Sequence, residues 1–151
     1  MRRPVARTGM PIAGVALWAL IAGPATVQAA DLVSFNTPSK NIYCMAYHAD
    51  SGAPEMTVEC EIRTIARSTL KIARPKNCDL DWGRRFAVRQ RGRPWLTCYG
   101  DTLISDDSRT IAYGKTQTFD GISCSSSQKG LRCVNPSGHG FILSRSLQQM
   151  F

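Results

Sequence analysis

Six cysteines constrain the fold of this 151-residue chain more than any other feature, and none of them occurs in the first thirty residues. They are Cys44, Cys60, Cys78, Cys98, Cys124 and Cys133. In an exported domain, an even number of cysteines predicts a disulfide framework. The alternative is a zinc site, but the chain has no Cys-x-x-Cys motif and its two histidines lie far from any paired ligands. We therefore expect three disulfides, with no bound metal and no cofactor.

The N-terminus predicts export. Three arginines lie in the first seven residues, an uncharged apolar run of about a dozen residues follows, and small side chains precede a cleavage point after Ala29. The run is too short for a membrane span, which needs roughly 18 apolar residues. We expect a signal peptide over 1–29 and one domain over 30–151. The mature chain would then lie in the periplasm or the extracellular medium, without a transmembrane segment.

Two predicted hairpins bring cysteines together. Apolar and polar residues alternate in MTVECEIR (56–63), which indicates a half-buried strand with Cys60 on its core face. NIYCMAY (41–47) forms its partner across the turn residues HADSGAP, so Cys44 faces Cys60. GISCSSS and GLRCVN repeat the arrangement around QKG. Bridges between consecutive cysteines, 44–60, 78–98 and 124–133, are the simplest of 15 possible pairings.

The rest of the chain favours short strands. RFAVRQ, PWLTCYG, TIAYG and GFILSR are further strand candidates, and Gly or Pro interrupts the chain at short intervals. The one candidate helix, Thr64 to Ala73, is short and could equally be a strand. We expect an all-β fold, a small disulfide-stapled sandwich or barrel of short antiparallel strands.

Several motifs, in order, resemble those of a group of small exported bacterial proteins classified only as a domain of unknown function. The matching pieces are FNTPSKNIYCM (35–45), the cysteine of VEC, CDLDWG (78–83), CYGDT (98–102), AYG (112–114), GISC, GLRC and GHGFILSR (138–145). The resemblance implies export, paired cysteines and a single β-rich domain, and it implies no catalytic residues. Lys40 stands where the similar proteins more often have glycine, which affects only the turn.

Charge is concentrated in one part of the mature chain, which carries sixteen bases and eleven acids. Residues 63–93 hold ten of the bases and two of the acids. Alternation in RFAVRQR directs Phe86 and Val88 inward, and it directs Arg85, Arg89 and Arg91 outward. Guanidinium groups suit two-pronged binding of phosphate or carboxylate. We therefore predict an anion-binding face formed by Arg84, Arg85, Arg89, Arg91 and Arg93. The alternative is a solvated edge strand whose charge prevents edge-to-edge pairing.

The predicted compartment limits the partners. An exported protein seldom meets nucleic acid, so we expect none. An anionic glycan or lipid head group of the cell envelope, or an acidic protein, fits better. The sequence thus favours an exported binding protein without enzymatic activity.

Two weaker possibilities remain at the sequence level. A hydrolase would need His139 with Asp101 and one of the serines at 125–127, but no nucleophile elbow surrounds those serines. An inhibitor of a secreted enzyme has no sequence signature. Asp79 and Asp81 are expected to form surface ion pairs with the neighbouring arginines rather than to bind Ca²⁺.

Overall fold

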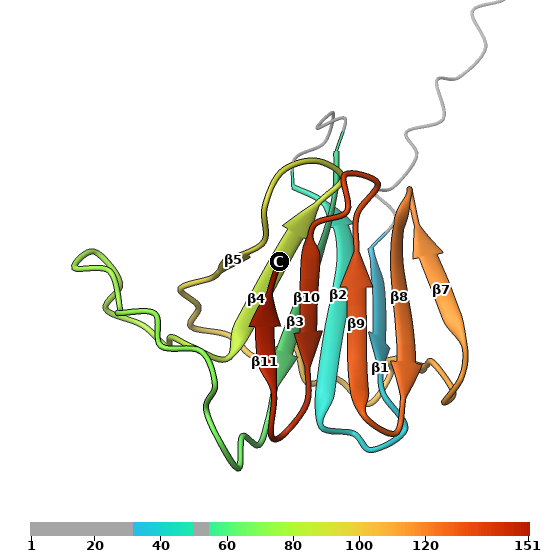
Figure 1. The fold of residues 1–151 in the computed structure, drawn as a ribbon, viewed down its shortest axis with the longest axis horizontal. Coiled ribbons are helices and arrows are strands. Elements are labelled where there is room, and N and C mark those ends of the chain that lie inside the picture. Colours follow the sequence, from blue (N-terminus) through green and yellow to red (C-terminus); the bar gives the residue numbers. More distant parts are fainter. Residues whose placement is uncertain (1–31, 50–54) are drawn as a thin grey trace, which may run out of the picture.

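The protein is a β-sandwich of two sheets packed face to face (Figure 1). The computed structural model describes residues 32–49 and 55–151, and it has no helix in these ranges. The all-β fold class is therefore confirmed, as the sandwich rather than the barrel. The predicted signal peptide over 1–29 lies outside the described residues.

The first sheet has six strands in the order β5-β4-β3-β2-β1-β6. Their bounds are β1 (Val33–Asn36), β2 (Ile42–His48), β3 (Met56–Ile62), β4 (Arg85–Arg89), β5 (Trp95–Leu96) and β6 (Arg109–Thr110). Neighbours are antiparallel except β1 and β6, which are parallel. The two edge strands are only two residues long, so PWLTCYG and TIAYG contribute less sheet than the sequence predicts.

The second sheet has five strands in the order β11-β10-β9-β8-β7, all antiparallel. Their bounds are β7 (Thr116–Phe119), β8 (Ile122–Ser127), β9 (Gly130–Val134), β10 (Gly140–Leu143) and β11 (Gln148–Met150). Both predicted hairpins are present, as β2–β3 and β8–β9. The sequence did not predict β1, β7 or β11.

The core lies between the sheets. Phe35 stacks on Phe119 with ring centroids 4.7 Å apart, and Phe86 lies 6.0 Å from Phe141. The three disulfides join consecutive cysteines as expected: 44–60, 78–98 and 124–133. The first and third link directly opposite residues of a hairpin, and their four cysteines are at most 1% exposed within the core. Each sheet therefore carries one disulfide on its inner face.

Residues 63–84, which we call the basic loop, connect β3 to β4 and extend beyond the sheets at the left of Figure 1. The interpretation of Thr64 to Ala73 as a helix or strand is wrong, because the segment has no regular structure. Its backbone finds partners elsewhere. The N–H groups of Ala66 and Arg67 donate to the carbonyl oxygen of Arg145, and Thr69 exchanges hydrogen bonds with Gln148.

Residues 97–108, the covering segment, cross the outer face of the six-stranded sheet from β5 at one edge to β6 at the other. The carboxylate of Glu61 accepts hydrogen bonds from the Thr102 hydroxyl and from the Leu103 N–H at 2.8 Å. All seven residues of β3 are consequently buried. The prediction of a half-buried strand is wrong for this reason, although Cys60 does face the core.

Lys40 closes the turn between β1 and β2 in the left-handed region, at φ 53°. Glycine adopts that conformation without strain, whereas a residue with a Cβ adopts it at some cost. The Lys40 ammonium group donates to Asn36 Oδ1 and to Thr110 Oγ1, both at 3.1 Å.

Candidate ligand-binding site

Arg85 does not belong to an exposed face. Its side chain leaves the sheet on the side away from the core, as predicted, but the residue is only 7% exposed. It forms an ion pair with Glu61 at 2.9 Å, donates to the carbonyl oxygen of Asp101, and lies 4.0 Å from the centre of the Tyr99 ring. The covering segment thus buries Arg85, which corrects the expectation that it points into solvent.

The pKa of the Tyr99 hydroxyl is raised above its usual value of 10.0, first by burial and then by the negative charge of Glu61. Tyr47, on the same outer face, donates to Glu59 at 3.3 Å, and its pKa is raised for the same two reasons, burial first. The outer side of this sheet is therefore a buried polar layer.

The four other predicted arginines are exposed but divided between the two ends of β4. Arg84 precedes the strand and donates to the carbonyl oxygen of Arg63. Arg89 ends the strand over the Trp95 ring at 5.2 Å. Arg91 and Arg93 follow in the turn to β5, and Arg91 lies 3.8 Å from Glu55. Arg84 and Arg89 lie five residues apart along β4, a distance of roughly 17 Å, so the arginines do not converge on one ligand.

The acidic pair of CDLDWG does not hold these arginines either. Asp79 and Asp81 are exposed, and the ion pairs between described residues are Arg85–Glu61 and Arg91–Glu55. The predicted pairing of Asp79 and Asp81 with arginine is therefore wrong. Asp81 instead pairs through its backbone with Tyr99. Across residues 32–49 and 55–151, no three His, Cys, Asp or Glu side chains lie close enough together to hold a metal ion.

The residues of the hydrolase hypothesis are not brought together. His139 lies in the turn between β9 and β10, where its carbonyl accepts from the Asn135 N–H. Ser125 pairs with Arg132 of β9, and Arg132 lies three residues before Asn135. Three residues of extended chain separate Arg132 and Asn135 by about 10 Å. Asp101 lies in the covering segment of the six-stranded sheet, whereas His139 lies in a turn of the five-stranded sheet. A general base needs hydrogen-bond distance to its partner.

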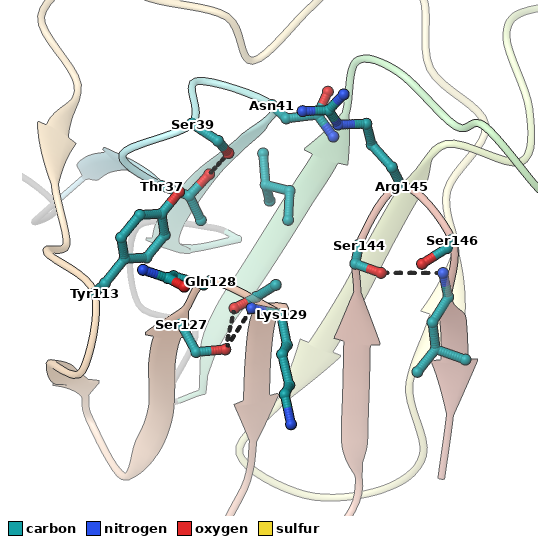
Figure 2. A pocket seen from close by; sticks show the side chains of 13 residues that line it. Thr37, Ser39, Asn41, Tyr113, Ser127, Gln128, Lys129, Ser144, Arg145 and Ser146 are labelled. Atoms are coloured by element: carbon teal, nitrogen blue, oxygen red, sulfur yellow. Dashed lines mark hydrogen bonds between the residues drawn. The ribbon is translucent and has the colours of Figure 1, made fainter.

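A pocket of about 500 Å³ opens where the strand turns meet at one end of the sandwich (Figure 2). We call it the end pocket. Its walls come from the turns β1–β2, β8–β9 and β10–β11 and from the segment before β7. Its lining is Thr37, Ser39, Asn41, Ile42, Tyr113, Ser127, Gln128, Lys129, Gly130, Ser144, Arg145, Ser146 and Leu147. It includes two cations and no acidic residue.

Some polar groups of the lining hold the turns in place. The Asn41 side chain exchanges two hydrogen bonds with the backbone of Thr64. The Ser127 hydroxyl accepts from the Lys129 N–H, and the Ser144 hydroxyl accepts from the Leu147 N–H at 3.0 Å. These bonds fix the walls of the end pocket without occupying its other polar groups.

The remaining polar groups are available to a ligand. Figure 2 shows Tyr113 at one side of the end pocket and Arg145 at the other. Among the described residues, the Arg145 guanidinium forms no ion pair with a carboxylate, and the Tyr113 side chain is 41% exposed. Gln128 and Ser146 add an amide and a hydroxyl to the lining. The Lys129 ammonium group points away from Arg145 in this view. The arrangement suits a small, hydroxylated anion.

The sequence did not predict this pocket, although the motifs noted above include most of the segments that form it. Four of the motif pieces, FNTPSKNIYCM, AYG, GLRC and GHGFILSR, each contribute lining residues. Each of these motifs predicts only a strand with an adjacent turn. The signal in the sequence is that several of these turns contain no acidic residue, whereas two of them contain the cations Lys129 and Arg145.

A family model described as a family of unknown function (DUF6636) matches residues 15–151. No curated protein and no solved structure matches the chain. In the part of the chain that the structure describes, no helix is long and apolar enough to cross a membrane. The three disulfides fit a compartment outside the reducing cytoplasm.

Proposed function

The chain belongs to DUF6636, a family of unknown function, and from the geometry of the end pocket we propose that it is an exported, non-enzymatic binding protein for a hydroxylated anion. The ligand class is a sugar that bears a carboxylate or a phosphate, as found in envelope glycans. One observation carries the proposal: the lining of the end pocket contains the Arg145 guanidinium and no acidic residue to neutralise it.

The dimensions and position of the end pocket support binding. Its volume of about 500 Å³ lies within the usual range for small-molecule sites, roughly 300–1,000 Å³. Turns at the end of a rigid sandwich are a common place for binding residues, because the sheets position them. The exposed Tyr113 ring offers a flat apolar surface to a sugar ring, and a guanidinium binds carboxylate or phosphate with two parallel hydrogen bonds.

Binding rather than catalysis is proposed because the lining has no carboxylate, imidazole or thiol that could act as a general base or nucleophile beside its hydroxyl groups. No Asp, Glu, His or Cys lines the end pocket. Its serines at 127 and 144 already close turns. The anionic class of ligand agrees with the prediction from composition, but the proposed site moves from the arginines of β4 to the end pocket.

The test is a titration of the disulfide-bonded chain with glucuronate, glucose 6-phosphate and neutral glucose, followed by NMR and calorimetry. We expect glucuronate or glucose 6-phosphate to shift the amide signals of Gln128, Arg145 and Ser146. Glucose should bind more weakly, because it lacks the charge. Arg145→Gln should weaken binding of the anion by about tenfold or more, since a charge-assisted hydrogen bond contributes roughly 1.5–3 kcal/mol.

Arg91→Gln is the matched control, because it removes the same charge beyond the C-terminal end of β4, at the other end of the sandwich from the end pocket. Its binding should equal that of the wild type. The proposal fails if neither anion shifts the end-pocket signals, or if Arg145→Gln and Arg91→Gln weaken binding equally.

A further inference from the structure

The basic loop carries an excess of cations, and none of them lines the end pocket. Residues 63–84 contain six cations and two acids. The cations are Arg63, Arg67, Lys71, Arg74, Lys76 and Arg84, all exposed. No ion pair joins any of them to a carboxylate of the described residues. The loop is therefore a projecting surface of net positive charge.

Large apolar side chains are exposed on the same surface. Ile72 is 43% exposed and Leu80 is 54% exposed, and both lie on the basic loop. Ile104, 38% exposed, lies close by: it shares a pocket with Gly100, and Gly100 lies against the Leu80 side chain. Three of the six large apolar residues that are exposed in the described ranges thus gather at this loop.

The base of the loop is held in place by a disulfide and by hydrogen bonds. We call the exposed residues 71–77 its tip. The Cys78–Cys98 disulfide ties it to the covering segment. The Trp82 indole N–H donates to the carbonyl oxygen of Ile72 at 3.1 Å. Asp81 and Tyr99 exchange backbone hydrogen bonds. Residues 71–77 between these ties are all exposed.

A pocket of about 450 Å³ opens at the base of the loop. Arg63 and Arg84 line it together with Trp82. One of its acids, Glu61, is already engaged by Arg85, and the other is Asp81. This pocket offers two guanidinium groups beside the exposed aliphatic side chains.

We infer that the basic loop docks on an anionic lipid surface, with Ile72 entering the head-group region while Lys71, Arg74 and Lys76 beside it meet lipid phosphates. Exposed aliphatic side chains among lysines and arginines are the combination that binds the interface of an anionic bilayer. An acidic protein would satisfy the cations but would leave unexplained why Ile72 is exposed among them.

The inference goes beyond the proposed ligand site, and the two are linked in space. The loop begins beside the end pocket, because Ala66 and Arg67 are bonded to the backbone of Arg145, a lining residue. The turns that form the end pocket and the start of the loop lie at the same end of the sandwich in Figure 1. Docking by the loop would hold the end pocket close to the sugars of lipid head groups.

The experiment measures sedimentation of the disulfide-bonded chain with vesicles of phosphatidylglycerol and phosphatidylcholine, against vesicles of phosphatidylcholine alone. We expect binding to the anionic vesicles only, weakening as salt is raised. The Lys71→Ser/Arg74→Ser/Lys76→Ser variant should bind about a hundredfold more weakly, at about fivefold for each cation removed. Ile72→Ser should weaken binding at every salt concentration, because the lost contribution is apolar.

The matched control is Arg89→Ser/Arg91→Ser/Arg93→Ser, which removes the same charge at the other end of β4 and should change binding by threefold or less. Thermal unfolding of each variant verifies that the sandwich is intact, since all the substituted side chains are exposed. The inference is overturned if wild type does not bind anionic vesicles at low salt, if the control weakens binding as much as the Lys71→Ser/Arg74→Ser/Lys76→Ser variant, or if Ile72→Ser binds normally. Arg145→Gln separates the two proposals, because it should lose sugar binding while keeping vesicle binding.

Discussion

The two sheets of the sandwich present their outer faces differently. The outer face of the six-stranded sheet lies under the covering segment and contains the buried pair Glu61–Arg85. The outer face of the five-stranded sheet is open, and its polar residues satisfy one another across strands, as Thr116 does with Ser125 at 2.7 Å. The same alternation of apolar and polar residues therefore produces a second buried layer in one sheet and a solvated surface in the other. Chain connectivity makes the difference, since within residues 32–49 and 55–151 a returning segment crosses only the first sheet.

The largest expected effect comes from removing one partner of the buried ion pair. Glu61→Ala leaves the Arg85 guanidinium buried without a counter-charge and frees the covering segment, so the free energy of unfolding should fall by about 3–5 kcal/mol. Arg132→Ala is the counterpart on the open sheet. Arg132 is exposed over the Phe151 ring at 4.9 Å, and its loss should cost less than about 1 kcal/mol. Urea denaturation of both variants checks the contrast, and equal losses would show that the two faces are not energetically different.

A smaller effect is expected from the hydroxyl that ties the covering segment to the sheet. Thr102 donates to the Glu61 carboxylate at 3.0 Å, so Thr102→Val should destabilise the protein by about 1.5–3 kcal/mol, the range for hydrogen bonds to charged groups. Thr116→Val on the open sheet removes an exposed hydroxyl and should change stability by less than about 0.5 kcal/mol. The measurement is again urea denaturation. A loss at Thr102 no greater than that at Thr116 would mean that this hydroxyl does not help to hold the covering segment, and that the Leu103 N–H and the Asp101 carbonyl provide its polar ties.

The smallest expected effect is on how the free energy of unfolding depends on pH in the alkaline range. The pKa values of Tyr47 and Tyr99 are raised above 10.0 in the folded protein, by burial first and by Glu59 and Glu61 second. A group whose pKa is raised on folding contributes stability below its unfolded pKa and loses it as the pH rises through the folded pKa. Stability should therefore decline above pH 10. Tyr47→Phe/Tyr99→Phe should decline less steeply when denaturation is measured between pH 9 and 11, and parallel curves would exclude the two hydroxyls as the cause.

Local patterns in the sequence predicted the hairpins and the disulfides well. Alternation and turn residues lie within a dozen positions of each other in β2–β3 and β8–β9, and the paired cysteines follow from the hairpin register. The strand β11 escaped prediction because its inward residue, Gln148, is polar and is satisfied by Thr69 and by the Ser144 carbonyl. No apolar alternation marks such a strand.

The site was harder to predict because it depends on contacts between distant segments. Arg85 and Arg89 occupy equivalent positions in the pattern of β4, yet one is buried and the other exposed. Only the crossing of residues 97–108 distinguishes them. In the same way, the turns of the end pocket were each recognisable as turns, but the order of the strands in two sheets decides that they meet.

The disulfide pairing has a consequence for how the chain can mature. Every bridge joins a cysteine to the next one along the chain, across sequence separations of 16, 20 and 9 residues. A polypeptide that crosses a membrane N-terminus first exposes Cys60 when Cys44 is the only available thiol, and each later pair emerges in the same way. An oxidant acting on thiols in order of appearance would close the three native bridges without any need to exchange wrong ones.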